Sequence, residues 1–245
     1  MNKDLIYSQP QSNVADFQFD RHVVDVFPDM IQRSVPGYAT IVDSIGQLCA
    51  RYAQNDSIIY DLGCSLGEAT LAARRYLGES KVSMIAIDNS KAMIERCQMH
   101  LAAFKSDIPV TVLEQDILDT EIKQASVVIM NFTLQFIAPE KREALLQKIF
   151  DGLLPGGVLI LSEKVSVEGG SINATLVELH HEFKRRNGYS ELEISQKRTA
   201  LEKVMRLEDQ EMHLERLKQL GFAEAHTWFQ CFNFSSMLAL KKVTD

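Results

Sequence analysis

The sequence predicts an α/β fold in which a mostly parallel, seven-stranded sheet is covered by helices on both faces and ends in an antiparallel last strand. Two observations carry this prediction. Short apolar runs alternate with segments of helical period between residues 57 and 162, a pattern typical of a parallel sheet. Two further strand-like runs close the chain, and the link between them is short enough for a hairpin. We expect residues 1–245 to form one domain, with an N-terminal arm (1–37) and a helical insertion (165–206).

The elements follow one another regularly after an irregular start. Residues 1–35 mix polar and aromatic side chains without a sustained period, which predicts an irregular arm before a helix at 38–52. Buried parallel strands are predicted at residues 57–62, 81–87, 110–114, 125–131 and 158–162. The helices between these strands are predicted at residues 67–76, 90–104 and 139–153.

The pattern changes after Ser162. Residues 165–206 are polar and helical in character, so we expect a helical insertion that serves as a lid or as a dimer interface. A helix at 207–220 and a strand at 225–231 bring the chain back to the sheet. The link at 232–235 then predicts an antiparallel last strand at 236–241.

Composition limits the classes of function. The formal charge of -7 opposes broad contact with nucleic-acid phosphates and favours a small-molecule substrate. Because no apolar run is long enough for a membrane span and the N-terminus does not resemble a secretory signal, we expect a cytoplasmic protein without membrane contact. The four cysteines lie far apart without a CxxC pair, so we expect neither a metal site nor a disulfide framework.

The turn at residues 61–67 is the expected ligand site, because ligands of open parallel sheets bind at the carboxyl ends of the strands. Ser65 stands where a dinucleotide fingerprint needs its second glycine, which argues against NAD. S-adenosylmethionine has no phosphate. Its amino-acid end needs a curve of backbone such as this one, and its ribose needs a carboxylate nearby.

Polar side chains end the next three strands. Asp88 is placed to accept hydrogen bonds from both ribose hydroxyls, and Asp116 to accept one from the adenine amino group beside Ile117. Asn131 can donate and accept at the methionine end of the ligand. Each residue alone is more typical of a turn or a helix cap, but their joint placement predicts an S-adenosylmethionine site.

Four segments resemble those of one enzyme family, the carboxy-S-adenosylmethionine synthases. They are D-L-G-C-S-L-G-E-A-T at 61–70, A-I-D-N-S at 86–90, N-F-T-L-Q-F-I at 131–137 and W-F-Q-C-F-N-F at 228–234. The similarity extends through the insertion, at residues 180–190 and 194–198. It implies a Rossmann-like class I methyltransferase fold.

The resemblance also implies a reaction. Members of the family transfer carbon dioxide released from prephenate to the methyl carbon of S-adenosylmethionine, giving the carboxylated compound and phenylpyruvate. S-adenosylmethionine is then a substrate rather than a resident cofactor. The resemblance implies a homodimer whose product passes to a tRNA carboxymethyltransferase that modifies the wobble uridine, so no direct contact with nucleic acid is expected.

By motif position, the resemblance implies ten ligand contacts: Tyr38, Gly63, Cys64, Ser65, Asp88, Asn89, Asp116, Ile117, Asn131 and Arg198. Arg198 is the implied catalytic residue, because a guanidinium can hold the added carboxylate through two charge-assisted bonds. Without the resemblance, its polar surroundings are typical of a solvated helix face. The same holds for the basic run at 184–186, and a surface or interface role is expected for His180 and His181.

Two rival functions remain open from the sequence. An ordinary methyltransferase that acts on a small molecule or on RNA would share the sheet and the cofactor contacts, and Arg198 would distinguish the two. A cofactor-binding subunit without turnover would retain the pocket but form no carboxylated compound.

Overall fold

A seven-stranded sheet forms the centre of the computed structural model, which describes residues 2–167 and 170–243. The strands are β1 (Ser57–Leu62), β2 (Val82–Asp88), β3 (Val110–Glu114), β4 (Ala125–Asn131), β5 (Leu153–Lys164), β6 (Glu224–Cys231) and β7 (Phe234–Leu240). Their order is β3-β2-β1-β4-β5-β7-β6. Strands β1 to β5 are parallel, whereas β7 runs antiparallel to both β5 and β6. The predicted fold class is confirmed.

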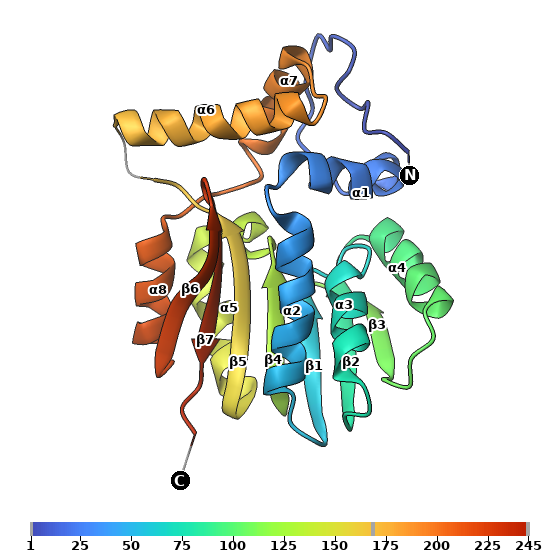
Figure 1. Ribbon diagram of the computed structural model, residues 1–245, viewed down its shortest axis with the longest axis vertical. Coiled ribbons are helices and arrows are strands. Elements are labelled where there is room, and N and C mark those ends of the chain that lie inside the picture. The colour runs from blue at the N-terminus through green and yellow to red at the C-terminus, as the bar shows by residue number, and fades with distance from the viewer. Residues whose placement is uncertain (1, 168–169, 244–245) are drawn as a thin grey trace.

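Helices cover both faces of the sheet (Figure 1). The helices along the chain are α1 (Arg21–Ser34), α2 (Tyr38–Tyr52), α3 (Glu68–Leu77), α4 (Lys91–Ala103), α5 (Pro139–Gly152), α6 (Ser171–Arg186), α7 (Glu191–Leu201) and α8 (Gln210–Gln219), with a 3-10 turn η1 at Leu134–Phe136. Ile41 and Ile45 of α2 pack with Ile59 and Ile129 on one face, while Leu145 of α5 lies in the cluster on the other. Both faces can be covered because successive side chains of a strand point to opposite sides of the sheet.

The sequence predicts an irregular N-terminal arm, but part of this arm is helical. Residues 21–34 form α1, whose first turn is capped by the Asp20 carboxylate accepting from the Val23 amide at 3.0 Å. Pro28 lies inside this helix and interrupts the local sequence signal, because proline lacks the amide that an interior position uses. Val23, Val24 and Met30 are nonetheless buried, so tertiary packing stabilises the helix.

The arm, α1, α6 and α7 lie together above the carboxyl ends of the parallel strands (Figure 1). The predicted insertion is therefore helical, and it stands at the edge of the sheet where ligands are expected. None of the helices in the described part of the chain is long and apolar enough to cross a membrane.

Candidate active site

A cavity of about 450 Å³ lies between the carboxyl ends of the strands and the helices above them. Nine of the ten predicted contacts line it: Tyr38, Gly63, Cys64, Ser65, Asp88, Asn89, Asp116, Ile117 and Asn131. The topology explains the convergence, because β1 and β4 are adjacent while their connections run in opposite directions along the sheet. A cavity of this size is typical of sites for small molecules.

The turn after β1 is held against the end of β2. The amides of Gly63 and Cys64 both donate to the Ile87 carbonyl, at 2.8 and 2.9 Å. Gly63 has a φ of +79°, and a Cβ at this position would lie 2.4 Å from Oγ1 of Thr133. Only glycine fits this position. Because Gly63 has no side chain, the turn can curve along the cavity.

Asp88 anchors the same turn from the end of β2. One carboxylate oxygen accepts the Ser65 amide and the other accepts the Ser90 amide, both at 2.9 Å. Burial raises the pKa of Asp88, and the backbone amides of Ser90, Ser65 and Asn89 oppose the rise. A carboxylate has about four acceptor positions, so two amides leave room for ribose hydroxyls.

Asp116 and Ile117 lie at the end of β3. The Asp116 carboxylate accepts the Leu118 amide at 2.8 Å, which folds the chain into a turn and presents buried Ile117 to the cavity. The two residues thus offer an acceptor beside an apolar surface, as an adenine ring requires.

Two further acids, missed by the sequence analysis, lie near the methionine end of the predicted ligand. Asp61 is fully buried at the end of β1, and burial raises its pKa to about 6, although the Thr70 hydroxyl donates to it at 2.6 Å. Glu68 begins α3, and burial raises its pKa as well. Their place on either side of the glycine turn was the available signal.

Asn131 provides the test of fit for S-adenosylmethionine. Its Oδ1 is buried without a hydrogen-bond partner among the described residues, although it lines the cavity. An orphaned buried acceptor costs free energy, and the ammonium of a methionine moiety would satisfy it. The residues present therefore fit a cationic amino-acid ligand.

The opposite side of the cavity is basic. Lys164 at the end of β5, His180 and Lys184 on α6, and Lys197 on α7 all line it. Lys184 is only 8% exposed and His180 only 4%. This corrects the expectation of a solvated face at Lys184, though not at Arg185 and Arg186, and the expectation of a surface or interface place for His180.

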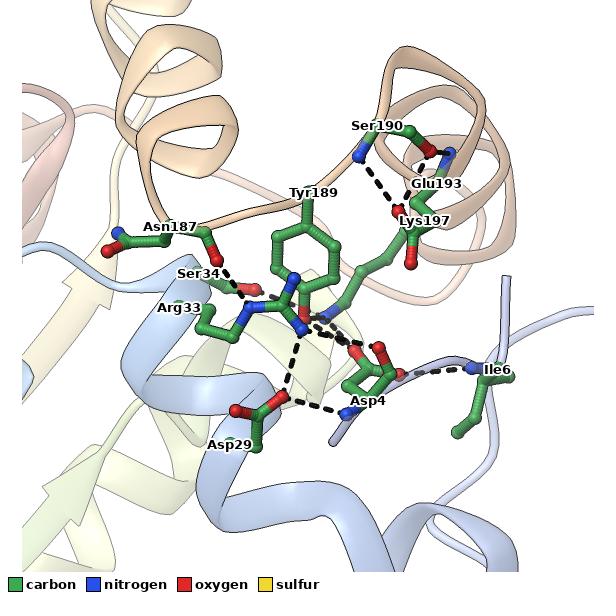
Figure 2. A network of polar contacts seen from close by, with 10 residues as sticks. All are labelled: Asp4, Ile6, Asp29, Arg33, Ser34, Asn187, Tyr189, Ser190, Glu193 and Lys197. Carbon is green, nitrogen blue, oxygen red and sulfur yellow. Dashed lines mark hydrogen bonds and ion pairs between the residues drawn. The ribbon is translucent and has the colours of Figure 1, made fainter. Parts of the chain in front are cut away.

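Lys197 belongs to a buried polar network that ties the N-terminal arm to the insertion (Figure 2). Its ammonium lies 3.3 Å from Asp4 Oδ2 and donates to Ser34 Oγ at 3.1 Å, and Tyr189 donates its hydroxyl proton to the same Asp4 oxygen. Arg33 donates to the Asp4 carbonyl and forms an ion pair with Asp29 at 2.9 Å. The arm, α1 and α7 are thereby joined above the cavity.

Known proteins match this chain over nearly its whole length. A family model described as a methyltransferase domain matches residues 59–157. A carboxy-S-adenosyl-L-methionine synthase of Aeromonas hydrophila is 59% identical over 98% of this chain and 96% of that protein. The chain belongs to the carboxy-S-adenosyl-L-methionine synthases. Synthases of Vibrio parahaemolyticus and Aliivibrio salmonicida are 57% and 55% identical, again over 98% of this chain and 98% and 99% of theirs.

Solved structures agree on the fold of this synthase family member. An O-methyltransferase family protein from Burkholderia thailandensis superimposes with a TM-score of 0.64 at 15% identity, over 93% of this chain and 62% of that one. A SAM-dependent methyltransferase from Methanosarcina mazei gives 0.58 at 14% identity, over 80% and 98%. The class I methyltransferase fold is confirmed.

Arg198 is the predicted contact that the structure does not bring to the cavity of this synthase family member. It is exposed on α7 and does not line the cavity, whereas its neighbour Lys197 does. Burial is the main cause that lowers the pKa values of Lys184 and His181, and the nearby charge of Arg198 contributes to both. Its role toward a carboxylate remains a prediction.

Proposed function

We propose that this protein converts S-adenosylmethionine and prephenate to carboxy-S-adenosylmethionine and phenylpyruvate. The observation that carries the proposal is the 55–59% identity to carboxy-S-adenosyl-L-methionine synthases over 98% of the chain. The match includes the insertion and the C-terminal strands as well as the segment shared with methyltransferases in general.

On the first side of the cavity, we assign S-adenosylmethionine to the glycine turn and the strand ends. Asp88 would accept the ribose hydroxyls, Asp116 and Ile117 would hold the adenine, and Asn131 the methionine ammonium. Tyr38, Gly63, Cys64, Ser65 and Asn89 complete the set that lines this side. The acids Asp61 and Glu68 favour a cationic ligand, because opposite charges attract strongly in a cavity with little water.

The chemistry needs a carbon nucleophile. The sulfonium acidifies its methyl group, so removal of one proton gives a sulfur ylide that attacks carbon dioxide and forms the new carbon–carbon bond. Prephenate releases that carbon dioxide together with hydroxide as its ring becomes aromatic, and the hydroxide takes the methyl proton and leaves as water. The protein positions the reactants and excludes bulk water, and this scheme assigns no role to a metal ion.

Arg198 is proposed to hold the carboxylate of the product. Its place outside the cavity lining is the observation that favours the rival, an ordinary methyltransferase. The proposed role requires α7 or a second subunit to bring Arg198 closer.

We propose a cytoplasmic homodimer. Exposed apolar side chains on the insertion support a contact there, with Ile172 71% exposed and Leu179 and Leu192 each 37% exposed. The product would pass to a tRNA carboxymethyltransferase, so this acidic chain itself need not bind RNA.

Mass spectrometry of the reaction tests the proposal. Purified protein is incubated with S-adenosylmethionine, with and without prephenate. We expect a product heavier than S-adenosylmethionine by the mass of carbon dioxide, together with phenylpyruvate, only when prephenate is present. If neither forms while S-adenosylhomocysteine accumulates with an added acceptor, the protein is a methyltransferase and the proposal is wrong.

A further inference from the structure

Four basic side chains face one another across the side of the cavity that S-adenosylmethionine would not fill. Lys164 ends β5, His180 and Lys184 lie one turn apart on α6, and Lys197 lies on α7. Each enters the cavity from a segment beyond residue 157, where the match to the methyltransferase domain ends. The shared cofactor-binding core therefore does not account for them.

Burial lowers the pKa of His180 to about 2, so it is neutral, and of the three lysines only Lys197 has an acid to balance it among the described residues. Lys197 lies against Asp4, as described above. Lys184 is more than nine-tenths buried, and within the described ranges it forms no ion pair; the charges that act on it come from Lys197, Lys164 and Arg198. Burial lowers the pKa of Lys184 to about 7 and also lowers that of Lys164.

Such an arrangement is costly without an anion. A buried ammonium that forms no ion pair gives up hydration without a compensating partner, and neighbouring cations add repulsion. A bound anion would remove both costs. Ionisable groups with pKa values perturbed by burial and by charged neighbours cluster at functional sites.

An aromatic surface lies among the cations. The Phe234 ring centroid lies 5.8 Å from Lys164 Nζ and 4.9 Å from the centre of the His180 ring. The Phe132 ring centroid lies 6.0 Å from that of Phe234, and the Tyr38 ring centroid lies 6.5 Å from that of Phe132. His180 is held in place because its Nε2 donates to the Ser34 carbonyl at 2.8 Å. The site thus offers an apolar ring surface beside the Lys164 ammonium, in a cavity that Lys184 also lines.

The position of this surface suits a reaction at the methyl carbon. Asn131 at the end of β4 pairs with Ser162 of β5, and Lys164 lies two residues further along β5. Lys164 is consequently beside the methionine end of the predicted ligand rather than beside its adenine. An anion bound there would adjoin the sulfonium.

We propose that Lys164 and Lys184 form the subsite for the two carboxylates of the second substrate, a six-membered carbocyclic dianion of the prephenate class, with its ring against Phe234. The inference rests on the proposed function and adds to it the residues that recognise the dianion. Two ammonium groups match the two negative charges, and the phenyl ring matches the apolar body of the substrate.

The test uses Lys164→Met and Lys184→Met, which keep most of the side-chain volume and remove the charge. Prephenate binding is measured by calorimetry with S-adenosylhomocysteine in place of S-adenosylmethionine, so that no turnover occurs, and KM values are measured separately for each substrate. Each variant is expected to weaken prephenate binding and raise its KM by about tenfold or more, because a hydrogen bond to a charged group is lost. The KM for S-adenosylmethionine should change by less than about twofold.

Lys123→Met is the matched control. Lys123 is exposed, pairs with Glu121, and precedes β4 at the opposite edge of the sheet, so its replacement should leave both KM values unchanged. Lys184→Arg keeps the charge and should retain prephenate binding within a few-fold, which guards against a general packing defect. Equal losses in the Arg and Met variants would overturn the subsite.

The outcomes separate this inference from the proposed function. A wild-type protein that forms no carboxylated product refutes the proposed function. A wild-type protein that is active, together with lysine variants of unchanged prephenate affinity, overturns the subsite alone. Variants that bind prephenate normally but lose affinity for carboxy-S-adenosylmethionine would assign the lysines to the product and would likewise overturn it.

Discussion

The two sides of the cavity carry opposite charge. The side made by the ends of β1, β2 and β3 and the start of α3 presents four acids: Asp61, Glu68, Asp88 and Asp116. The side made by β5, α6 and α7 presents the ammonium groups of Lys164, Lys184 and Lys197, beside His180, which is neutral because burial lowers its pKa to about 2. S-adenosylmethionine carries a sulfonium and an ammonium, whereas prephenate carries two carboxylates. The contrast teaches that charge alone can direct each substrate to its own side and bring the reacting groups together.

The sides also differ in origin. All four acids lie within residues 59–157, the segment that matches methyltransferases in general. The four basic residues named above lie beyond it, whereas Lys141 of α5, which also lines the cavity, lies within it. The acidic side is set by strand ends in a buried sheet. The basic side depends on an insertion held by contacts to the N-terminal arm. A common cofactor site has thus been combined with a separate surface for a second substrate.

The largest expected effect concerns the buried ion pair between Lys197 and Asp4, which ties the N-terminal arm to the basic side of the cavity. Lys197→Met leaves the Asp4 carboxylate buried without its cation, and the two side chains are only 5% and 2% exposed. We expect the free energy of unfolding to fall by about 3 kcal/mol, measured by urea denaturation. Lys203→Met on the same segment is the control, because its pair with Asp16 is exposed and should contribute less than about 0.5 kcal/mol. Equal losses of stability in the two variants would show that the Lys197–Asp4 ion pair does not stabilise the basic side.

The next effect concerns the acidic side alone. Asp88→Asn removes the charge that would receive the ribose hydroxyls, so we expect S-adenosylmethionine to bind about thirtyfold more weakly by calorimetry, a loss of about 2 kcal/mol. Prephenate affinity should stay within about twofold, since Asp88 lies on the other side. Asp119→Asn, at an exposed position outside the cavity lining, should change neither affinity. Parallel losses for both ligands would contradict the division into two sides.

A smaller effect is expected at Arg198. Arg198→Ala should lower the affinity for carboxy-S-adenosylmethionine about tenfold while nearly sparing S-adenosylmethionine, because only the former has the additional carboxylate. Competitive binding of the two compounds measures the ratio. A variant that loses affinity for both equally would remove the assigned role and leave the lysines as the remaining cations of the basic side.

The smallest effect is a pH dependence. Because burial and the cations Lys197 and Lys164 lower the pKa of Lys184 to about 7, its ammonium is lost as the pH rises through that value. The groups that face it include Arg198 from α7 and His180 and His181 from its own helix. The KM for prephenate should therefore rise several-fold between about pH 6.5 and 8.5, and the rise should be smaller in Lys184→Met. An unchanged slope in the variant would assign the dependence to another group.

The acidic side was largely predictable from the sequence. Asp88, Asp116 and Asn131 each follow an apolar strand, and local pattern places strand ends at one edge of a parallel sheet. Asp61 and Glu68 flank the same turn, which was the available signal, but they look like ordinary strand and helix residues and were missed.

The basic side was not predictable in this way. The run at 184–186 looks solvated because two of its three residues are so: Arg185 pairs with Glu178 and Glu191, and Arg186 with Glu182. Lys184 instead points inward, a direction set by the packing of α6 on distant segments. Such long-range contacts leave no local periodicity, which is also why α1 with its Pro28 was missed.

Isotope tracing tests the central claim that the two sides bind both substrates at once for a direct transfer. Prephenate labelled in its ring carboxylate is supplied with S-adenosylmethionine in the presence of excess unlabelled bicarbonate, and the product is analysed by mass spectrometry. We predict that carboxy-S-adenosylmethionine retains the label almost completely, because carbon dioxide passes directly from one side to the other within the cavity that both substrates share. A product that carries mostly unlabelled carbon would show that carbon dioxide enters from solution and would contradict the account.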